Sequence, residues 1–123
     1  MTGSRDILLF EVGAVRYGCA VREVSLIGAG AADLDAERVV QTVLGEPASG
    51  LRSLVVECPD GKRELVIDEV IGVRSVPADA LRDLPEFAVE WMPTRAVRGL
   101  ALLDDAITLI IDLPALLAGS APG

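Results

Sequence analysis

An Asp-Gly turn between two apolar runs is the feature that most constrains this fold. The runs cover residues 51–58 and 63–70, and Pro59-Asp60-Gly61-Lys62 connects them. This arrangement is a strong β-hairpin signal, because glycine adopts the positive φ that a tight hairpin turn requires. Leu54 on the first run and Leu65 on the second can then share one face of the hairpin. The centre of the chain is therefore expected to form two antiparallel strands.

A second hairpin is predicted near the start of the sequence. The apolar run of residues 7–12 ends at Gly13. In residues 15–22, apolar side chains at the odd positions then alternate with arginine or small residues at the even positions. A period of two is typical of a strand with one buried face. Cys19 lies within that strand, and Cys58 lies in the central hairpin. Because no secretion signal precedes them, both cysteines are interpreted as reduced, buried thiols rather than as a disulfide.

The last hairpin is predicted at residues 96–111, where Asp104-Asp105 forms the turn. Asp112 follows, and it is expected to cap a short helix at residues 113–118, since aspartate accepts hydrogen bonds from the first amides of a helix. A proline in the first turn of that helix is tolerated. Residues 119–123 are expected to be a disordered tail.

The segments between these hairpins are less sharply patterned. Residues 25–32 are rich in glycine and alanine and indicate a loop or the start of a helix. Apolar residues from Val39 to Leu44 recur at helical spacing, which predicts a short amphipathic helix at residues 35–44. Residues 77–93 contain three prolines and are predicted to be a connector.

Composition limits the classes of partner. The chain has 123 residues, of which 51% are hydrophobic, so one domain can bury a core without metals or disulfides. Its net charge of −8 argues against nucleic acid, which requires a basic face, and against anionic membranes. No apolar run is long enough for membrane insertion, and the polar first residues do not resemble a signal peptide. We therefore expect a cytoplasmic protein.

No catalytic or cofactor site is evident. The sequence has no histidine, which removes Ser-His-Asp and Cys-His arrangements, and no Cys/His cluster has the spacing of metal ligands. Carboxylates do occur in pairs, as at Asp68-Glu69 and Asp104-Asp105 and with Glu57 near Asp60. They are better explained as turn residues or as strand neighbours that point to opposite faces. The sequence therefore predicts no enzyme, no metal and no cofactor.

Val70 and Val73 lie in a stretch that is apolar on both faces around Gly72. A strand of this kind is either buried between two subdomains or offers one face to a partner. The sequence favours neither explanation over the other.

Two other apolar groups also have two explanations each. Val21, Val24 and Ile27 step by three, which fits a helical turn packed on the core or a ridge that contacts a partner; packing is the preferred interpretation. Phe87 and Trp91 either anchor a partner or fold over the open end of a barrel. Packing is again preferred, because scattered aromatic residues more often belong to a core.

The order of these elements resembles the chemotaxis coupling protein (CheW-like) family over residues 7–117. Residues 66–73 are similar to the family's Val-Asp-x-Val segment, and Pro85-Glu86-Phe87 is similar to its connector. The last hairpin and helix of the family are matched by Arg98-Gly99-Leu100, residues 109–113 and Leu116-Leu117. An early family strand pattern is matched by Tyr17, Cys19, Val21, Val24 and Ile27, with Leu26 at the usual glutamate position.

The resemblance implies a single CheW-like domain at residues 1–118, built from two small SH3-like β-barrels. The first subdomain is expected at about residues 7–50 and the second at about residues 51–118. In the family, an Asn-Leu-Arg-Gly strand lies between the positions of Ile27 and Leu51, and this chain lacks it. We therefore expect a mainly β fold with one complete barrel, one reduced barrel and two short helices.

In function, the resemblance implies a non-enzymatic adaptor that couples chemoreceptors to a signalling kinase. The expected partners are the helical signalling tip of a receptor and the regulatory domain of a histidine kinase or another coupling protein. Loss of the Arg-Gly element and of the glutamate predicts weakened kinase binding, and a homodimer would cover the strand edges left open. The residues expected at partner surfaces are Val21, Val24, Leu26, Ile27, Val70, Val73 and Gly99. The alternatives are a small-ligand-binding β-barrel and, less favoured, an enzyme with an unrecognised site.

Overall fold

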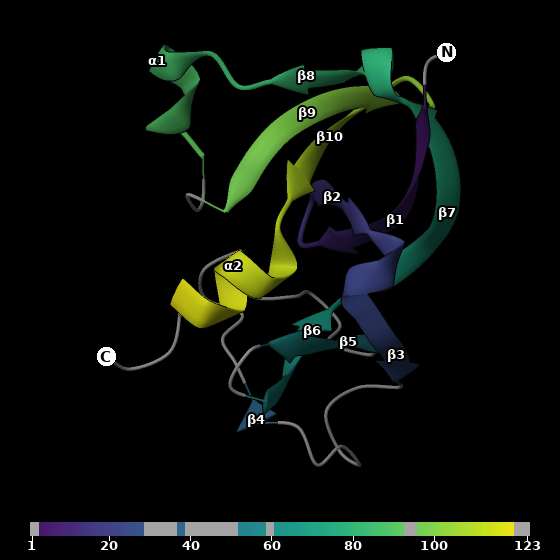
Figure 1. Cartoon of the computed structure of the whole chain (residues 1–123), viewed down its shortest axis with the longest axis vertical. Helices are drawn as coiled ribbons and strands as arrows, with labels where there is room; N and C mark the ends of the chain where they lie inside the picture. The colour runs from purple at the N-terminus through teal and green to yellow at the C-terminus, as the bar shows by residue number, and fades with distance from the viewer. Residues whose placement is uncertain (1–2, 29–36, 39–51, 59–60, 93–95, 120–123) are drawn as a thin grey trace.

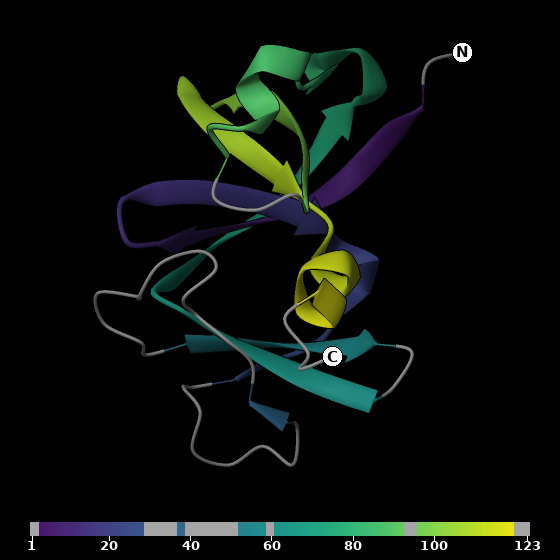
Figure 2. The same ribbon diagram turned by 90° about the vertical axis from the view of Figure 1, so that its left-hand side faces the viewer.

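The computed structural model describes residues 3–28, 37–38, 52–58, 61–92 and 96–119. These form two β-sheets, and Figures 1 and 2 show the larger, curled sheet stacked above the smaller one. The larger sheet has the strand order β7 (Glu69–Pro77), β1 (Ser4–Val12), β2 (Val15–Ala20), β10 (Ala106–Ile111), β9 (Val97–Leu103) and β8 (Leu81–Asp83). The smaller sheet has the order β3 (Val24–Gly28), β5 (Arg52–Cys58), β6 (Gly61–Ile67) and β4 (Glu37–Arg38).

Four short helical elements lie between or beside the strands of the described residues. The α-helix α2 (Leu113–Gly119) lies between the two sheets, while α1 (Glu86–Val89) projects from the side of the larger one (Figure 1). Two 3₁₀ turns, η1 (Val21–Glu23) and η2 (Ala78–Ala80), precede β3 and β8. The mainly β fold with two short α-helices is confirmed.

All three predicted hairpins are present. The strand pairs β1–β2, β5–β6 and β9–β10 are each antiparallel. Asp104 and Asp105 have φ values of 51° and 61°, which a two-residue turn of type I′ requires at both central positions. Aspartate tolerates this left-handed conformation better than most residues, so the acidic pair is explained by the turn.

Sheet membership does not follow the expected subdomain boundary near residue 50. The chain builds β1 and β2 in the larger sheet, leaves to form β3–β6, and returns with β7–β10. Asp68 is the single residue between β6 and β7, so the chain changes sheets there without a loop. The apolar run of the sequence continues through this point because both strands are packed on a core.

The buried apolar side chains form two clusters. The larger cluster lies between the sheets and draws on β1, β2, β5, β6, β9, β10 and α2. The smaller one lies inside the curl of the larger sheet and consists of Ile7, Leu9 and Val76 with partly buried neighbours. Leu8 and Phe10 face the first cluster while Ile7 and Leu9 face the second, so β1 is buried on both faces. This explains its unbroken apolar sequence.

Three predicted segments differ from the structure. Residues 24–28 form β3 rather than a loop or helix start, and the connector at 77–93 contains β8, which pairs with β9. Glu37–Arg38, predicted as helix, pairs in parallel with Arg63 and Glu64 of β6. The rest of the predicted helix at 35–44 lies outside the described residues. Backbone pairing with a neighbouring strand overrides helical side-chain spacing in so short a segment.

The aromatic pair near α1 does not cover the barrel. Phe87 is 76% exposed and Trp91 is 82% exposed, so the packing interpretation of these residues is wrong. Phe87 lies on α1 and Trp91 just after it, while the part of the connector that joins the larger sheet is β8, which pairs with β9.

Cys19 agrees with its interpretation as a buried thiol. It is fully buried, and burial raises the pKa of its thiol to about 12, so the thiol stays uncharged and unreactive at neutral pH. Cys58 is only half-buried, and the two cysteines do not form a disulfide with each other.

Candidate partner-binding site

The two edge strands β3 and β7 carry most of the predicted partner-binding residues. β7 is one edge of the larger sheet and β3 is one edge of the smaller sheet. Both strands run along the same side of the molecule, on the right in Figure 1 and at the back in Figure 2. Val24 of β3 and Val70 of β7 also pack against the same inter-sheet cluster.

A one-residue bulge interrupts each of these strands. In β7, Val70 lies opposite Phe10 and Val73 opposite Leu8, so Ile71 is an extra residue. Without it, strand alternation would place Val70 and Val73 on opposite faces. With it, both side chains lie on the face that Leu8 and Phe10 turn to the inter-sheet core.

β3 repeats this arrangement at Ser25. Val24 lies opposite Val56, and Ile27 lies opposite Leu54, with one extra residue between. Val56 and Leu54 belong to the inter-sheet core, so Val24 and Ile27 share that face. The three-residue spacing of the sequence therefore reflects a bulged strand and not a helical turn beyond η1.

These four residues form what we call the edge-strand surface: Val24, Ile27, Val70 and Val73. Val24 and Val70 pack on the core, but Ile27 is 46% exposed and Val73 is 50% exposed. Ile27 and Val73 therefore face the inter-sheet core but remain partly exposed to solvent. Apolar side chains exposed in this way are typical of a surface that contacts a partner.

The other predicted residues lie apart from this surface. Leu26 is opposite Val55, on the other face of β3. Val21 belongs to η1 and lines a separate pocket. Gly99 is buried in β9, and a Cβ there would clash with the carbonyl oxygen of Arg82. The close approach that Gly99 permits is thus made by the chain's own β8.

Asp68 has a structural role that the sequence did not reveal. Its carboxylate accepts a hydrogen bond from the Gly13 amide at 2.6 Å, and its own amide donates to the Glu11 carbonyl at 2.9 Å. Gly13 has a φ of 61° in the β1–β2 turn. Asp68 therefore ties the point where the chain changes sheets to the N-terminal hairpin, which explains an acidic residue inside an apolar run.

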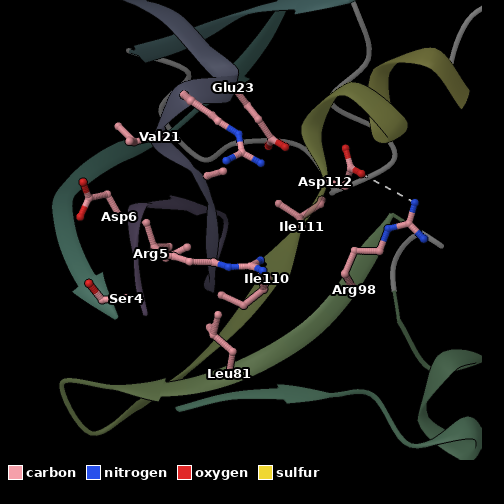
Figure 3. Close-up of a pocket in the computed structure, with 13 residues that line it drawn as sticks. Ser4, Arg5, Asp6, Val21, Glu23, Leu81, Arg98, Ile110, Ile111 and Asp112 are labelled. Carbon is pink, nitrogen blue, oxygen red and sulfur yellow. Dashed lines mark ion pairs between the residues drawn. The ribbon is translucent and has the colours of Figure 1, made fainter. Parts of the chain in front are cut away.

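A pocket of about 480 Å³ opens beside η1, at one end of the curled sheet (Figure 3). Its walls come from β1, η1, the start of β8, β9 and the end of β10. Among its lining residues are Arg5, Arg22 and Arg98 together with Ile110 and Leu81.

Two carboxylates beside this pocket hold α2 in place. Asp112 accepts a hydrogen bond from the Ala115 amide at 3.0 Å, as predicted for its capping role, and lies 3.8 Å from Arg98. Glu23 accepts a hydrogen bond from the Leu113 amide at 3.3 Å. Burial raises the pKa of the Glu23 carboxyl, and the nearby charge of Asp112 adds to that effect.

Neither a metal centre nor a membrane span emerges from the described residues. Within them, no group of three His, Cys, Asp or Glu side chains could hold a metal ion. None of their helices is long and apolar enough to cross a bilayer.

Comparison with known proteins identifies the family. The profile of the CheW-like domain matches residues 34–121 of the chain. This chain belongs to the CheW-like family. The CheW-like chain is also 35% identical, over 108 residues, to the frizzy aggregation protein FrzB of Myxococcus xanthus, covering 88% of the chain and 90% of that relative.

A solved structure supports the fold of the CheW-like chain. The scaffolding protein TtCheW from Thermoanaerobacter tengcongensis superposes with a TM-score of 0.64 over 89% of each chain, at 19% identity. The family places the chain among scaffold and coupling proteins of chemosensory systems.

Proposed function

We propose that this chain is a non-enzymatic, cytoplasmic adaptor that binds the helical signalling tip of a chemoreceptor on the edge-strand surface. The observation that carries the proposal is the pair of bulges in β3 and β7. Together they turn Ile27 and Val73 to the inter-sheet face and leave both about half exposed. An amphipathic helix buries its apolar stripe against a surface of this kind.

We further propose that binding to the kinase regulatory domain is weaker than in a typical coupling protein. The sequence between Ile27 and Leu51 lacks the Arg-Gly element of the family. Leu26, at the position where the family usually has glutamate, is 51% exposed on the outer face of β3. A loss of charge at an exposed interface position weakens pairing with a charged partner.

The test is a binding assay against two fragments from one organism, a receptor signalling tip and a kinase regulatory domain. Val73→Arg and Ile27→Arg should each weaken tip binding by about tenfold or more, since they place a charge in an apolar interface core. Val89→Arg is the matched control, because Val89 is 43% exposed on α1, which lies on the opposite side of the molecule from β3 and β7 in Figure 1.

The outcomes separate the parts of the proposal. Normal tip binding by Val73→Arg and Ile27→Arg would show that the receptor contacts another surface. Strong binding of the kinase domain by the unmodified chain would contradict the weakened kinase contact. Val70 is not used as a test position, because it packs on the core and a charge there would disturb folding.

Self-association is a separate proposal. Among the described residues, β3 pairs only with β5, so its second edge offers backbone groups to a further strand. A second copy could supply that strand. A monomer by light scattering at high protein concentration would contradict the homodimer.

A further inference from the structure

The pocket beside η1 has properties that the adaptor function does not use. Its volume, about 480 Å³, falls within the range of pockets that enclose small organic molecules. Only Val21 among the predicted partner residues lines it, and the edge-strand surface lies on other elements. A site for a small molecule is therefore separate from the proposed receptor contact.

One wall of the pocket is apolar. Ile7 belongs to the core inside the curl, and Ile110 packs against that core. Leu81, at the start of β8, also packs against it and lines the pocket. Figure 3 shows Leu81 and Ile110 side by side, with the Arg5 side chain reaching toward Ile110. A ligand with an apolar body can cover these side chains and exclude water from them.

The other wall contains guanidinium groups without ion-pair partners. Arg98 is paired with Asp112, at 3.8 Å. Arg5 and Arg22 line the pocket at exposed positions. Within the described residues neither lies within ion-pair distance of a carboxylate, and, against the larger effect of burial, the charge of Arg22 lowers the pKa of the Glu23 carboxyl. Two unpaired arginines in one pocket are notable in a chain whose net charge is −8.

The carboxylates that line the pocket either accept hydrogen bonds from backbone amides or point away from Arg5. Asp112 and Glu23 accept hydrogen bonds from amides of the first turn of α2. Asp6 follows Arg5 on β1, and neighbouring residues of a strand point to opposite faces. Figure 3 shows the Asp6 carboxylate at the margin of the view, away from the Arg5 guanidinium.

We propose that this pocket binds a small organic anion, with its acidic group held by Arg5 and Arg22 and its apolar body against Ile110 and Leu81. The planar guanidinium fork of arginine matches both carboxylate and phosphate oxygens and donates two hydrogen bonds to either. The acidic group is therefore a carboxylate or a phosphate ester, and the apolar wall selects for a hydrocarbon body next to it.

The test titrates the full chain with four probes that share a phenyl body and is read by amide chemical shifts. The probes are 3-phenylpropionate, phenyl phosphate, the neutral 3-phenylpropanamide and the cationic 3-phenylpropylamine. We expect the acidic probes to shift amides of residues 4–7, 21–23 and 110–112, with an affinity at least about tenfold above that of the amide. The tighter of the two acids identifies the preferred acidic group.

Variants locate the binding groups. Arg5→Gln and Arg22→Gln should each weaken binding of the better acid by about tenfold, and Arg5→Lys should recover part of the loss, since it restores charge but not the fork. Arg52→Gln, at an exposed position on β5 of the smaller sheet, is the matched control and should bind normally.

Several results would overturn the proposal. One is the absence of acid-induced shifts in these residues up to about 10 mM probe, a concentration that would still detect very weak binding. Another is equal affinity for the amide, or tighter binding of the amine. Equal weakening by Arg52→Gln would show that general charge, and not the pocket, attracts the acid. None of these results depends on receptor binding.

Discussion

The two sheets of this molecule differ in the apolar clusters to which each contributes. The larger sheet encloses a core of its own, around Ile7, Leu9 and Val76, besides the core that it shares. An ion pair of 3.2 Å between Arg74 of β7 and Asp104 of the β9–β10 turn links two parts of its curl. The smaller sheet packs one face on the shared cluster, through residues such as Leu54 and Leu65, and it buries Val55 and Val66 on its other face.

The pocket and the edge-strand surface are distributed differently over the two sheets. The larger sheet, which encloses a second core, carries the pocket, whose walls must hold their positions. The smaller sheet contributes β3, one of the two strands of the edge-strand surface, where a partner can cover the apolar side chains that the chain leaves exposed. Four substitutions test how the two sheets and the helix between them hold together.

The largest effect is expected from Leu54→Ala. Leu54 is fully buried in the shared cluster, and truncating a buried leucine costs about 2–5 kcal/mol, through lost contacts and the cavity left behind. Because both sheets pack on this cluster, urea unfolding followed by circular dichroism should show one transition for the whole domain.

Leu9→Ala is the matched variant, since Leu9 is equally buried but belongs to the core inside the curl. Because both sheets contribute to the shared cluster, both variants should lower hydrogen-exchange protection in both sheets. Loss of protection confined to the smaller sheet in Leu54→Ala would show that the larger sheet folds on its own.

Gly99→Ala should have the second largest effect. The added methyl group would meet the Arg82 carbonyl, which is backbone and cannot rotate away, and overpacking of this kind costs about 1–3 kcal/mol. The loss should be concentrated in β8, as reduced exchange protection of its pairing with β9. Gly3→Ala serves as the control, because a Cβ there meets no atom within 4 Å. Unchanged stability of Gly99→Ala would place β8 farther from β9.

Asp112→Ala tests the helix that separates the sheets. It removes the hydrogen bond to the Ala115 amide, and loss of such a cap typically costs about 1 kcal/mol. The exposed pair with Arg98 should add little. Asp112→Asn retains a capping oxygen, so thermal unfolding should rank it between the unmodified protein and Asp112→Ala. Equal stability of all three proteins would contradict the capping role.

The smallest effect concerns the pH dependence that Glu23 contributes. Burial raises its pKa above the ordinary value of 4.5, so the folded protein binds this proton more tightly than the unfolded chain does. The contribution of Glu23 to stability is therefore greatest at low pH and declines as the pH rises through 4.5 and past the folded pKa. Glu23→Gln keeps an acceptor for the Leu113 amide but has no proton to lose.

Urea unfolding at a series of pH values would measure this effect as a difference between the two proteins. The stability of the unmodified chain relative to Glu23→Gln should fall from pH 4 toward pH 7, an interval chosen to span the ordinary range of a glutamate. A difference that rises over this interval would mean that pairing, and not burial, dominates the environment of Glu23.

Local signals in the sequence predicted the hairpins and the final cap well. The Asp104-Asp105 turn and the Asp112 cap depend on neighbours within a few residues, and the structure has both. The strand β8 was not predicted, because it exists through pairing with β9 across α1 and not through its own three residues.

The candidate site was predicted in part. Its apolar residues stand out in the sequence, but their orientation depends on bulges at Ser25 and Ile71, which have no local signature. A bulged strand and a helical turn both give a spacing of three, so the sequence alone did not distinguish them. The arginine pocket was missed because its walls come from both ends of the chain.

The return of the chain to its first sheet also sets an order for folding during synthesis. β2 finds its second neighbour, β10, only when the last hairpin has been made, and Glu23 waits for Leu113, 90 residues later. Until then the N-terminal hairpin exposes apolar faces, and contacts between such distant residues form slowly. A ribosome-bound chain that stops before β10 should therefore hold β7, β1 and β2 as a partial sheet whose β2 edge is still unpaired.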